Sequence, residues 1–173
     1  MIGITGGIGS GKSTIAEALR QRGFTVYDCD REAKRIIVED AEVRQAIVDL
    51  LGKKAYVDGK YNTAYVAQRV FEDAGLREQL NAIVHPAVEQ DIRLKQPDFV
   101  ESAILYESGL DKLCENVIVV DAPEEIRLAR TLNRSYDVRA RMRAQVIPEG
   151  DLKICNDGKE SIEALVEKIT HWM

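Results

Sequence analysis

A glycine-rich segment near the start of the chain carries the clearest chemical signal. Gly6, Gly11, Lys12 and Ser13 match the pattern G-x-x-x-x-G-K-[ST], between a short apolar run and a segment with helical periodicity. Glycines accept backbone angles closed to other residues, so successive N–H groups can point inward around a phosphate. Lys12 can reach the terminal phosphates, the Ser13 hydroxyl can bind Mg²⁺, and the helix dipole adds positive potential. The segment therefore predicts a nucleoside-triphosphate site.

A pair of acidic residues follows the second predicted strand. Residues 24–27 form a short β run, Asp28 and Asp30 come next, and a helix is expected over 31–38. In an open α/β sheet, ligands bind at the carboxyl ends of the strands, where we expect Asp30 to lie beside the glycine loop. Asp30 can also cap the following helix, and the two roles are compatible. We favour a direct functional role.

Six arginines gather in a short part of a chain whose net charge is −5. A helix is expected from Pro123, and the spacing places the first three arginines on its neighbouring turns. The six are Arg127, Arg130, Arg134, Arg139, Arg141 and Arg143. Such a run is either a solvated basic face or a set of cations near a migrating phosphoryl group. We favour the second interpretation for some of these arginines.

The elements that must position these side chains alternate between strand and helix. Further β candidates cover 99–106, which ends at Glu107, and then 116–120 and 152–155, while a closing helix is expected after Ser161. Strands that alternate with helices indicate an α/β fold with a mainly parallel sheet.

The stretch 38–93 interrupts this alternation because it shows no convincing strand. Its apolar residues repeat at helical spacing, with breaks at Gly52 and at a turn over 57–60. Pro86 suits the first position of a helix, so we expect one helix to end and another to begin there. His85 is then a turn residue or a substrate contact, and the residues alone slightly favour the turn. A helical block between β segments indicates an inserted lobe for the second substrate.

Composition sets the remaining expectations. The 173 residues suit one domain with an inserted lobe, and the acidic balance argues against a protein that coats nucleic acid. The three cysteines have no metal-binding spacing, which indicates reduced thiols. No apolar stretch approaches the length of a membrane span, and the first strand leaves no room for a signal peptide. We therefore expect a cytoplasmic protein without membrane or nucleic-acid partners.

Taken together, several motifs resemble those of the dephospho-coenzyme A kinase family. In chain order they are Gly3-Ile-Thr-Gly-Gly-Ile-Gly-Ser-Gly-Lys-Ser13, Asp28-Cys-Asp30, Val84-His-Pro-Ala-Val88, Ile104-Leu-Tyr-Glu107, Arg130-Thr-Leu-Asn-Arg134, Ala144-Gln145 and Asn156-Asp-Gly158. The first motif is shared by all phosphate-loop proteins, whereas the combination is specific. The resemblance runs nearly from end to end of the chain.

The resemblance implies a nucleoside-monophosphate-kinase-like P-loop fold. It consists of a three-layer sandwich with a five-stranded parallel sheet, a helical coenzyme A lobe at about 31–95 and a lid at about 134–146 within one domain, 1–173. The implied reaction is ATP-dependent phosphorylation of the ribose 3′-hydroxyl of dephospho-coenzyme A, with Mg²⁺, in the last step of coenzyme A synthesis. Alternatives are another small-metabolite or nucleoside monophosphate kinase of this fold, or a non-catalytic nucleotide sensor. The implied substrates are ATP and dephospho-coenzyme A, and a monomer is favoured.

The resemblance also implies a role for individual residues. The expected catalytic residues are Lys12, Asp30, Arg134 and Arg141, with Asp30 as the base that accepts the hydroxyl proton. The expected ATP-binding residues are Gly7, Gly9, Ser10, Gly11, Lys12, Ser13, Thr14, Asn156 and Gly158, with Mg²⁺ at Ser13. The expected contacts to the acceptor are Asp28, Asp30, His85 and Glu107.

Overall fold

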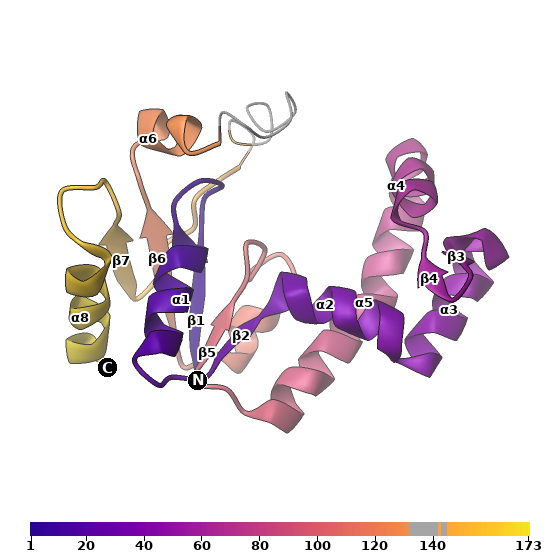
Figure 1. Ribbon diagram of the computed structural model, residues 1–173, viewed down its shortest axis with the longest axis horizontal. Helices are drawn as coiled ribbons and strands as arrows, with labels where there is room; N and C mark the ends of the chain where they lie inside the picture. The colour runs from indigo at the N-terminus through magenta and orange to yellow at the C-terminus, as the bar shows by residue number, and fades with distance from the viewer. Residues whose placement is uncertain (132–141, 143–144) are drawn as a thin grey trace. The chain divides into compact units, whose positions relative to one another are not determined.

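The computed structural model describes residues 1–131, 142 and 145–173 (Figure 1). The chain divides into two compact units. It passes from one to the other between residues 28 and 29 and returns between residues 95 and 96. One unit combines Met1–Asp28 with Gln96–Met173, and the other is Cys29–Lys95. No helix in the described ranges combines the length and the apolar character needed to cross a lipid bilayer.

The first unit is built on a five-stranded parallel sheet. Its strands are β1 (Ile2–Gly6), β2 (Val26–Asp28), β5 (Phe99–Glu101), β6 (Asn116–Asp121) and β7 (Leu152–Cys155). They lie in the order β2-β5-β1-β6-β7, and every neighbouring pair is parallel. The predicted α/β fold with a parallel sheet is confirmed.

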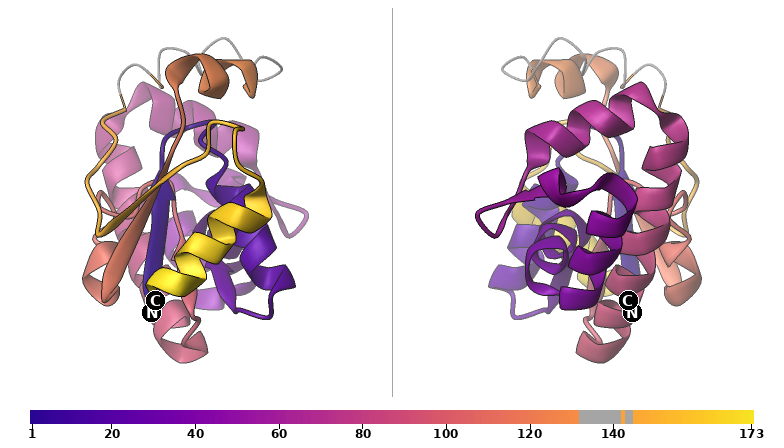
Figure 2. Two further views of the ribbon diagram at one scale, coloured as in Figure 1. Left: turned by 90° about the vertical axis from the view of Figure 1, so that its left-hand side faces the viewer. Right: turned by 90° about the vertical axis from the view of Figure 1, so that its right-hand side faces the viewer.

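Apolar residues on both sides of β1 explain its central place. The helices of this unit are α1 (Lys12–Gln21), the short 3₁₀ helix η2 (Leu110–Leu113), α6 (Glu124–Ala129) and α8 (Ile162–Trp172). α1 and α8 pack against each other along the sheet (Figures 1 and 2). Ile4 and Ile118 of the strands share one buried cluster with Leu19 of α1 and Ile169 of α8. Continuous apolar runs such as β6 are typical of strands buried on both faces.

The strand register decides which residues share the functional edge of the sheet. Gly6 ends β1, and Glu101 ends β5 opposite Ile4. Asp28 ends β2 opposite Glu101. The carboxyl ends of these strands therefore meet at one edge, where ligands bind in open parallel sheets.

The predicted strand over 99–106 was too long, since β5 ends at Glu101. After it, Ser102 N donates to the carbonyl of Ile4 at 3.0 Å, and the Ser102 hydroxyl accepts from Ile104 N at 3.2 Å. A serine side chain that bonds to nearby backbone favours a turn over a strand. Glu107 consequently lies on an exposed turn, away from the strand end where it was expected.

The second unit is mainly helical, as the helical spacing predicts, but it also contains two short paired strands that were not expected. It contains α2 (Cys29–Glu39), α3 (Ala41–Leu51), the 3₁₀ helix η1 (Lys53–Ala55), β3 (Tyr56–Val57), β4 (Lys60–Tyr61), α4 (Thr63–Glu72) and α5 (Ala74–Lys95). Asp40 and Asn62 cap α3 and α4 with side-chain hydrogen bonds. The predicted turn over 57–60 joins the two-residue strands β3 and β4, because Asp58 and Gly59 both adopt positive φ, as a tight hairpin requires.

Pro86 does not start a new helix, and that prediction was wrong. α5 runs through it for 22 residues. An interior proline removes one backbone hydrogen bond and costs about 3 kcal/mol. Buried Val84, Val88 and Ile92 lie on both sides of the proline on one face of α5, which packs against α2, α3 and α4. We attribute the continuous helix to this packing, which outweighs the local preference.

Candidate active site

The glycine loop between β1 and α1 has the conformation that its sequence predicts. Gly6, Gly9 and Gly11 adopt φ of 150°, 79° and 90°, values that side-chain-bearing residues rarely reach. A Cβ on Gly9 would lie 2.6 Å from the carbonyl oxygen of Arg127, so space also demands glycine there. α1 begins at Lys12, and Gly11 has no side chain with which to cap it. The first turn of α1 thus offers backbone N–H groups and a positive dipole end to an anion.

Two side chains from distant parts of the chain hold the loop in place. Asn156 Nδ2 donates to the carbonyl of Ser10 at 2.9 Å, and Arg130 Nη1 donates to the same oxygen at 3.2 Å. Arg130 Nη2 also donates to the backbone carbonyl of Asn156 at 3.0 Å. Arg130 Nη1 further lies 3.4 Å from the carbonyl oxygen of Gly9. Carbonyl oxygens of the loop would repel a phosphate. These hydrogen bonds pair them with cationic and amide donors.

A third side chain reaches the loop from the end of the segment that was predicted as the lid. Gln145 Oε1 accepts from the backbone N–H of Ile8 at 2.9 Å. The pair Ala144-Gln145 entered the sequence argument only through the family resemblance. The contact gives Gln145 a physical role, because it fixes the first half of the glycine loop.

Glu101 is the residue of this site that sequence reasoning missed. It is buried at the end of β5, with Oε1 3.5 Å from the Ser13 hydroxyl and 3.9 Å from Lys12 Nζ. The signal was present in the sequence, since a charged residue stands inside the apolar run 99–106. That run was assigned to a single strand ending at Glu107. Glu101 was therefore placed inside the strand and not at its end.

The two aspartates of the acidic pair fall in different elements. β2 ends at Asp28, which is half-buried and lies opposite Glu101 in the sheet. Asp30 lies in the first turn of α2, is exposed, and belongs to the second unit. The expectation that Asp30 ends a strand was therefore wrong, since pairing with β5 ends at Asp28. Asp30 is also not the cap of α2, because that helix already begins at Cys29.

The remaining predicted residues are dispersed. His85 is half-buried inside α5, and burial lowers its pKa, so the neutral imidazole prevails at neutral pH. Gly158 lies in the bend after β7 with φ of 85°. Arg134 and Arg141 fall outside the described residues. The first unit thus brings together the loop, Lys12, Ser13, Glu101, Arg130 and Asn156.

Oxygen donors at the start of α1 suit a magnesium ion. Ser13 is exposed and its hydroxyl lies beside the Glu101 carboxylate, and Mg²⁺ prefers hydroxyl, carboxylate, phosphate and water oxygens. No group of three His, Cys, Asp or Glu side chains in the described ranges is arranged to hold a metal by itself. The donor set therefore fits a metal that arrives bound to substrate phosphates.

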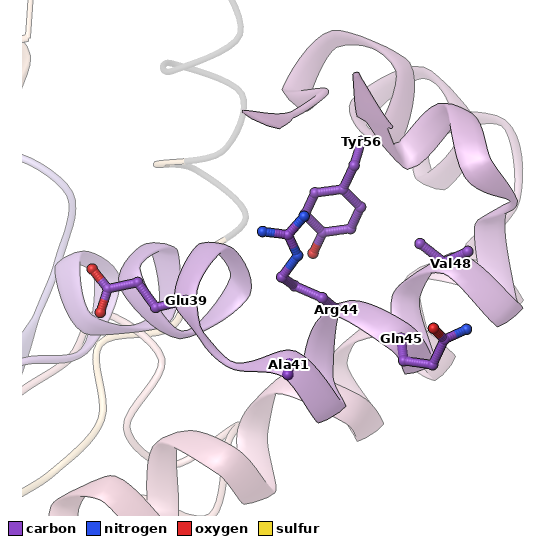
Figure 3. Close-up of a pocket in the computed structure, with 6 residues that line it drawn as sticks. All are labelled: Glu39, Ala41, Arg44, Gln45, Val48 and Tyr56. Atoms are coloured by element: carbon purple, nitrogen blue, oxygen red, sulfur yellow. The ribbon is translucent and has the colours of Figure 1, made fainter. Parts of the chain in front are cut away.

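A separate pocket of about 380 Å³ opens in the second unit (Figure 3). Its lining consists of Glu39, Ala41, Arg44, Gln45, Val48 and Tyr56. The Arg44 guanidinium stacks on the Tyr56 ring, 4.7 Å from its centroid. Both side chains also donate hydrogen bonds to backbone carbonyls at the end of α2. Tyr56 Oη donates to Ile37 O, and Arg44 Nη1 donates to Val38 O. None of the residues predicted to act on a substrate lines this pocket.

Comparison with known proteins agrees with this geometry. A family model described as dephospho-CoA kinase matches residues 1–158. A dephospho-CoA kinase from Porphyromonas gingivalis is 40% identical over 154 residues, which cover 86% of this chain and 76% of that protein. A solved structure from Thermus thermophilus is 32% identical, with a TM-score of 0.81 over 99% of this chain and 96% of that one.

The fold alone is also shared with the dephospho-CoA kinase from Campylobacter jejuni. That chain is 24% identical, with a TM-score of 0.72 over 98% of this chain and 94% of its own. The sheet order, the glycine loop and the extent of the family match lead to one conclusion. The chain belongs to the dephospho-CoA kinase family.

Proposed function

We propose that this protein transfers the γ-phosphoryl group of ATP to the ribose 3′-hydroxyl of dephospho-coenzyme A, which gives ADP and coenzyme A. The observation that carries the proposal is the glycine loop, with Lys12, Ser13 and Glu101 at its end, in a chain of this family. Phosphoryl transfer needs little covalent work from a protein, so positioning and charge stabilisation decide the rate.

The loop and the start of α1 bind the nucleotide in this proposal. Backbone N–H groups between Gly9 and Thr14 would surround the phosphates, and Lys12 would neutralise the charge that grows on the transferred group. Asn156 and Gly158 lie on the turn that would face the adenine. Asn156 also holds Ser10, so nucleotide binding and loop conformation are coupled through one side chain.

Ser13 and Glu101 would hold Mg²⁺ between them, Ser13 directly and Glu101 directly or through a bound water. The metal would neutralise phosphate oxygens and orient the γ-phosphoryl group. Glu101 Oε1 also lies 3.9 Å from Lys12 Nζ. We infer that this contact keeps the Lys12 ammonium at the mouth of the loop.

The acceptor side of the reaction rests on the acidic pair. Asp30 would orient the 3′-hydroxyl and accept its proton, and Asp28 would be a further contact to the acceptor. Asp30 is an exposed carboxyl group in the first turn of α2, so a hydroxyl of the acceptor could reach it from solvent. His85 would contribute as a neutral hydrogen-bonding group of the helical unit, and that unit would bind the rest of the acceptor.

The test is a direct assay. The protein is incubated with Mg²⁺, ATP and dephospho-coenzyme A, and ADP and coenzyme A are quantified together by chromatography. Parallel reactions contain shikimate or a nucleoside monophosphate in place of dephospho-coenzyme A. We expect coenzyme A and ADP in equal amounts, and no product from the other acceptors. ATP binding without transfer to any acceptor would favour the nucleotide sensor instead.

A further inference from the structure

Arg127 lies against the first half of the glycine loop. It belongs to the short helix α6, near the loop between β1 and α1 (Figures 1 and 2). A Cβ on Gly7 would overlap Arg127 Nη1 and lie 3.4 Å from its Cζ. A Cβ on Gly9 would lie 2.6 Å from the Arg127 carbonyl oxygen and 3.0 Å from its Cα. Both the guanidinium and the main chain of this residue therefore touch the loop.

Two nitrogens of the Arg127 guanidinium are left unsatisfied by the described part of the chain. Its Nε and Nη1 are buried and have no hydrogen-bond partner among the described residues, and the same holds for the Ser10 hydroxyl of the loop. A buried donor without an acceptor is costly, and more so on a charged group. Arg130, three residues on, is bonded to loop carbonyls and to Asn156 and so accounts for the structural support.

We propose that Arg127 is a further anion-binding residue of this site and that its missing partner is the polyphosphate of the nucleotide. This inference rests on the proposed function and deepens it. A guanidinium carries several donors in a planar fork that matches phosphate oxygens, and it keeps its charge at any physiological pH. Arg127 supplies positive charge beside Gly7 and Gly9, whereas Lys12 supplies it at the other end of the loop.

A polyphosphate would offset the cost of the two Arg127 nitrogens that the described residues leave unsatisfied. Two unit charges a few ångströms apart in a partly buried site interact by several kcal/mol. Bound polyphosphate would supply this attraction to the Arg127 guanidinium. Replacement of such a partly unsatisfied cation by an apolar side chain of similar size is expected to leave the empty protein as stable as before, or more stable.

The experiment measures binding without any acceptor. Isothermal titration with inorganic triphosphate, ATP and adenosine is run on wild type, Arg127→Met and Arg127→Lys. The control is Arg22→Met, since Arg22 is exposed and its guanidinium donates to the backbone carbonyl of Glu163. Thermal unfolding of each ligand-free protein is recorded in parallel.

We expect Arg127→Met to bind triphosphate and ATP about tenfold or more weakly, the change for one lost charge-assisted hydrogen bond. Arg127→Lys should retain part of the affinity, adenosine binding should not change, and the ligand-free Tm of Arg127→Met should equal or exceed that of wild type. In the kinase assay the KM for ATP should rise while the KM for dephospho-coenzyme A stays constant.

Three outcomes would overturn the assignment. These are wild-type affinity for triphosphate in Arg127→Met, an equal loss of adenosine affinity, or a ligand-free Tm several degrees below wild type in both variants. The last two would make Arg127 a structural residue of the loop. Because no acceptor is present, a failure to phosphorylate dephospho-coenzyme A would leave this result intact and would reject the proposed function alone.

Discussion

The carboxylate of Glu101 lies 3.5 Å from the hydroxyl of Ser13, where the end of β5 meets the start of α1. The parallel register of β5 with β1 produces this relationship, because it places Glu101 opposite Ile4, two residues before β1 ends. A buried carboxylate thus stands beside both the cation and the hydroxyl that a nucleoside triphosphate with Mg²⁺ requires.

Glu101→Gln should lower kcat by about a hundredfold and raise the Mg²⁺ concentration needed for half-maximal rate, because the amide keeps the shape but loses the negative charge near the metal. The Kd for ATP without Mg²⁺ should stay close to that of wild type. Steady-state kinetics over a series of Mg²⁺ concentrations checks this. Glu115→Gln is the control, since Glu115 is exposed and pairs with the N-terminus. An unchanged Mg²⁺ dependence in Glu101→Gln would remove Glu101 from the metal site.

Asn156→Ala should lower the free energy of unfolding by about 1–3 kcal/mol and raise the KM for ATP, because it leaves the Ser10 carbonyl with fewer donors and removes an acceptor of Arg130. Denaturant unfolding and the ATP dependence of the rate measure the two effects. The neighbouring Asp157 forms its own ion pair with the exposed Lys159, so Asp157→Ala serves as the control. Loss of stability with an unchanged KM for ATP would show that the loop does not depend on Asn156.

Glu32→Gln tests the charge cluster of the second unit. Hydrogen bonds from Lys95 and then from Arg35 hold the pKa of Glu32 at about 2, below its ordinary 4.5. Arg31 also faces this carboxylate, and Asp91 bonds both Arg35 and Lys95. Since the folded pKa is depressed, the ionised Glu32 stabilises the fold fully above about pH 4.5, and this contribution is lost as the pH falls towards 2.

We therefore expect Glu32→Gln to be less stable than wild type at pH 7 by about 2–3 kcal/mol. The difference should shrink as the pH falls from 4.5 to 2, because the wild-type carboxyl becomes protonated as well. Denaturant unfolding at a series of pH values gives the two curves. A difference that stays constant down to pH 2 would contradict the depressed pKa.

Asp30→Asn should lower kcat strongly, by about a hundredfold or more, while ATP still binds with wild-type affinity, because the amide cannot accept the hydroxyl proton. Single-turnover kinetics and ATP titration separate the two effects. Asp58→Asn is a suitable control, since Asp58 lies on the exposed hairpin turn and asparagine tolerates its positive φ. Full activity in Asp30→Asn would withdraw its role as the base.

The glycine loop could be predicted because its requirements lie in contiguous residues: three glycines with positive φ, then the lysine and serine that open a helix. Pro86 shows the limit of local rules. The contacts of buried Val84, Val88 and Ile92 with other helices outweigh the preference of proline for the first position of a helix.

Glu101 shows a second limit, because a strand ends where its pairing ends. The end of β5 follows from its register with β1 and β2, and no local residue pattern records that register. The partners of Ser10 illustrate the same point. Arg130 and Asn156 are more than a hundred residues away in the chain, so their hydrogen bonds to the loop follow only from the folded structure.

The central claim is that an amide-lined loop with Lys12 delivers the phosphoryl group of ATP to one hydroxyl of dephospho-coenzyme A. The most direct test is to follow wild type and Lys12→Ala by ³¹P NMR with Mg²⁺, ATP and dephospho-coenzyme A. We predict that wild type produces the 3′-phosphomonoester resonance of coenzyme A in step with ADP, and that Lys12→Ala loses most of this turnover while staying folded. Release of inorganic phosphate without that resonance, or equal rates in both proteins, would contradict the account.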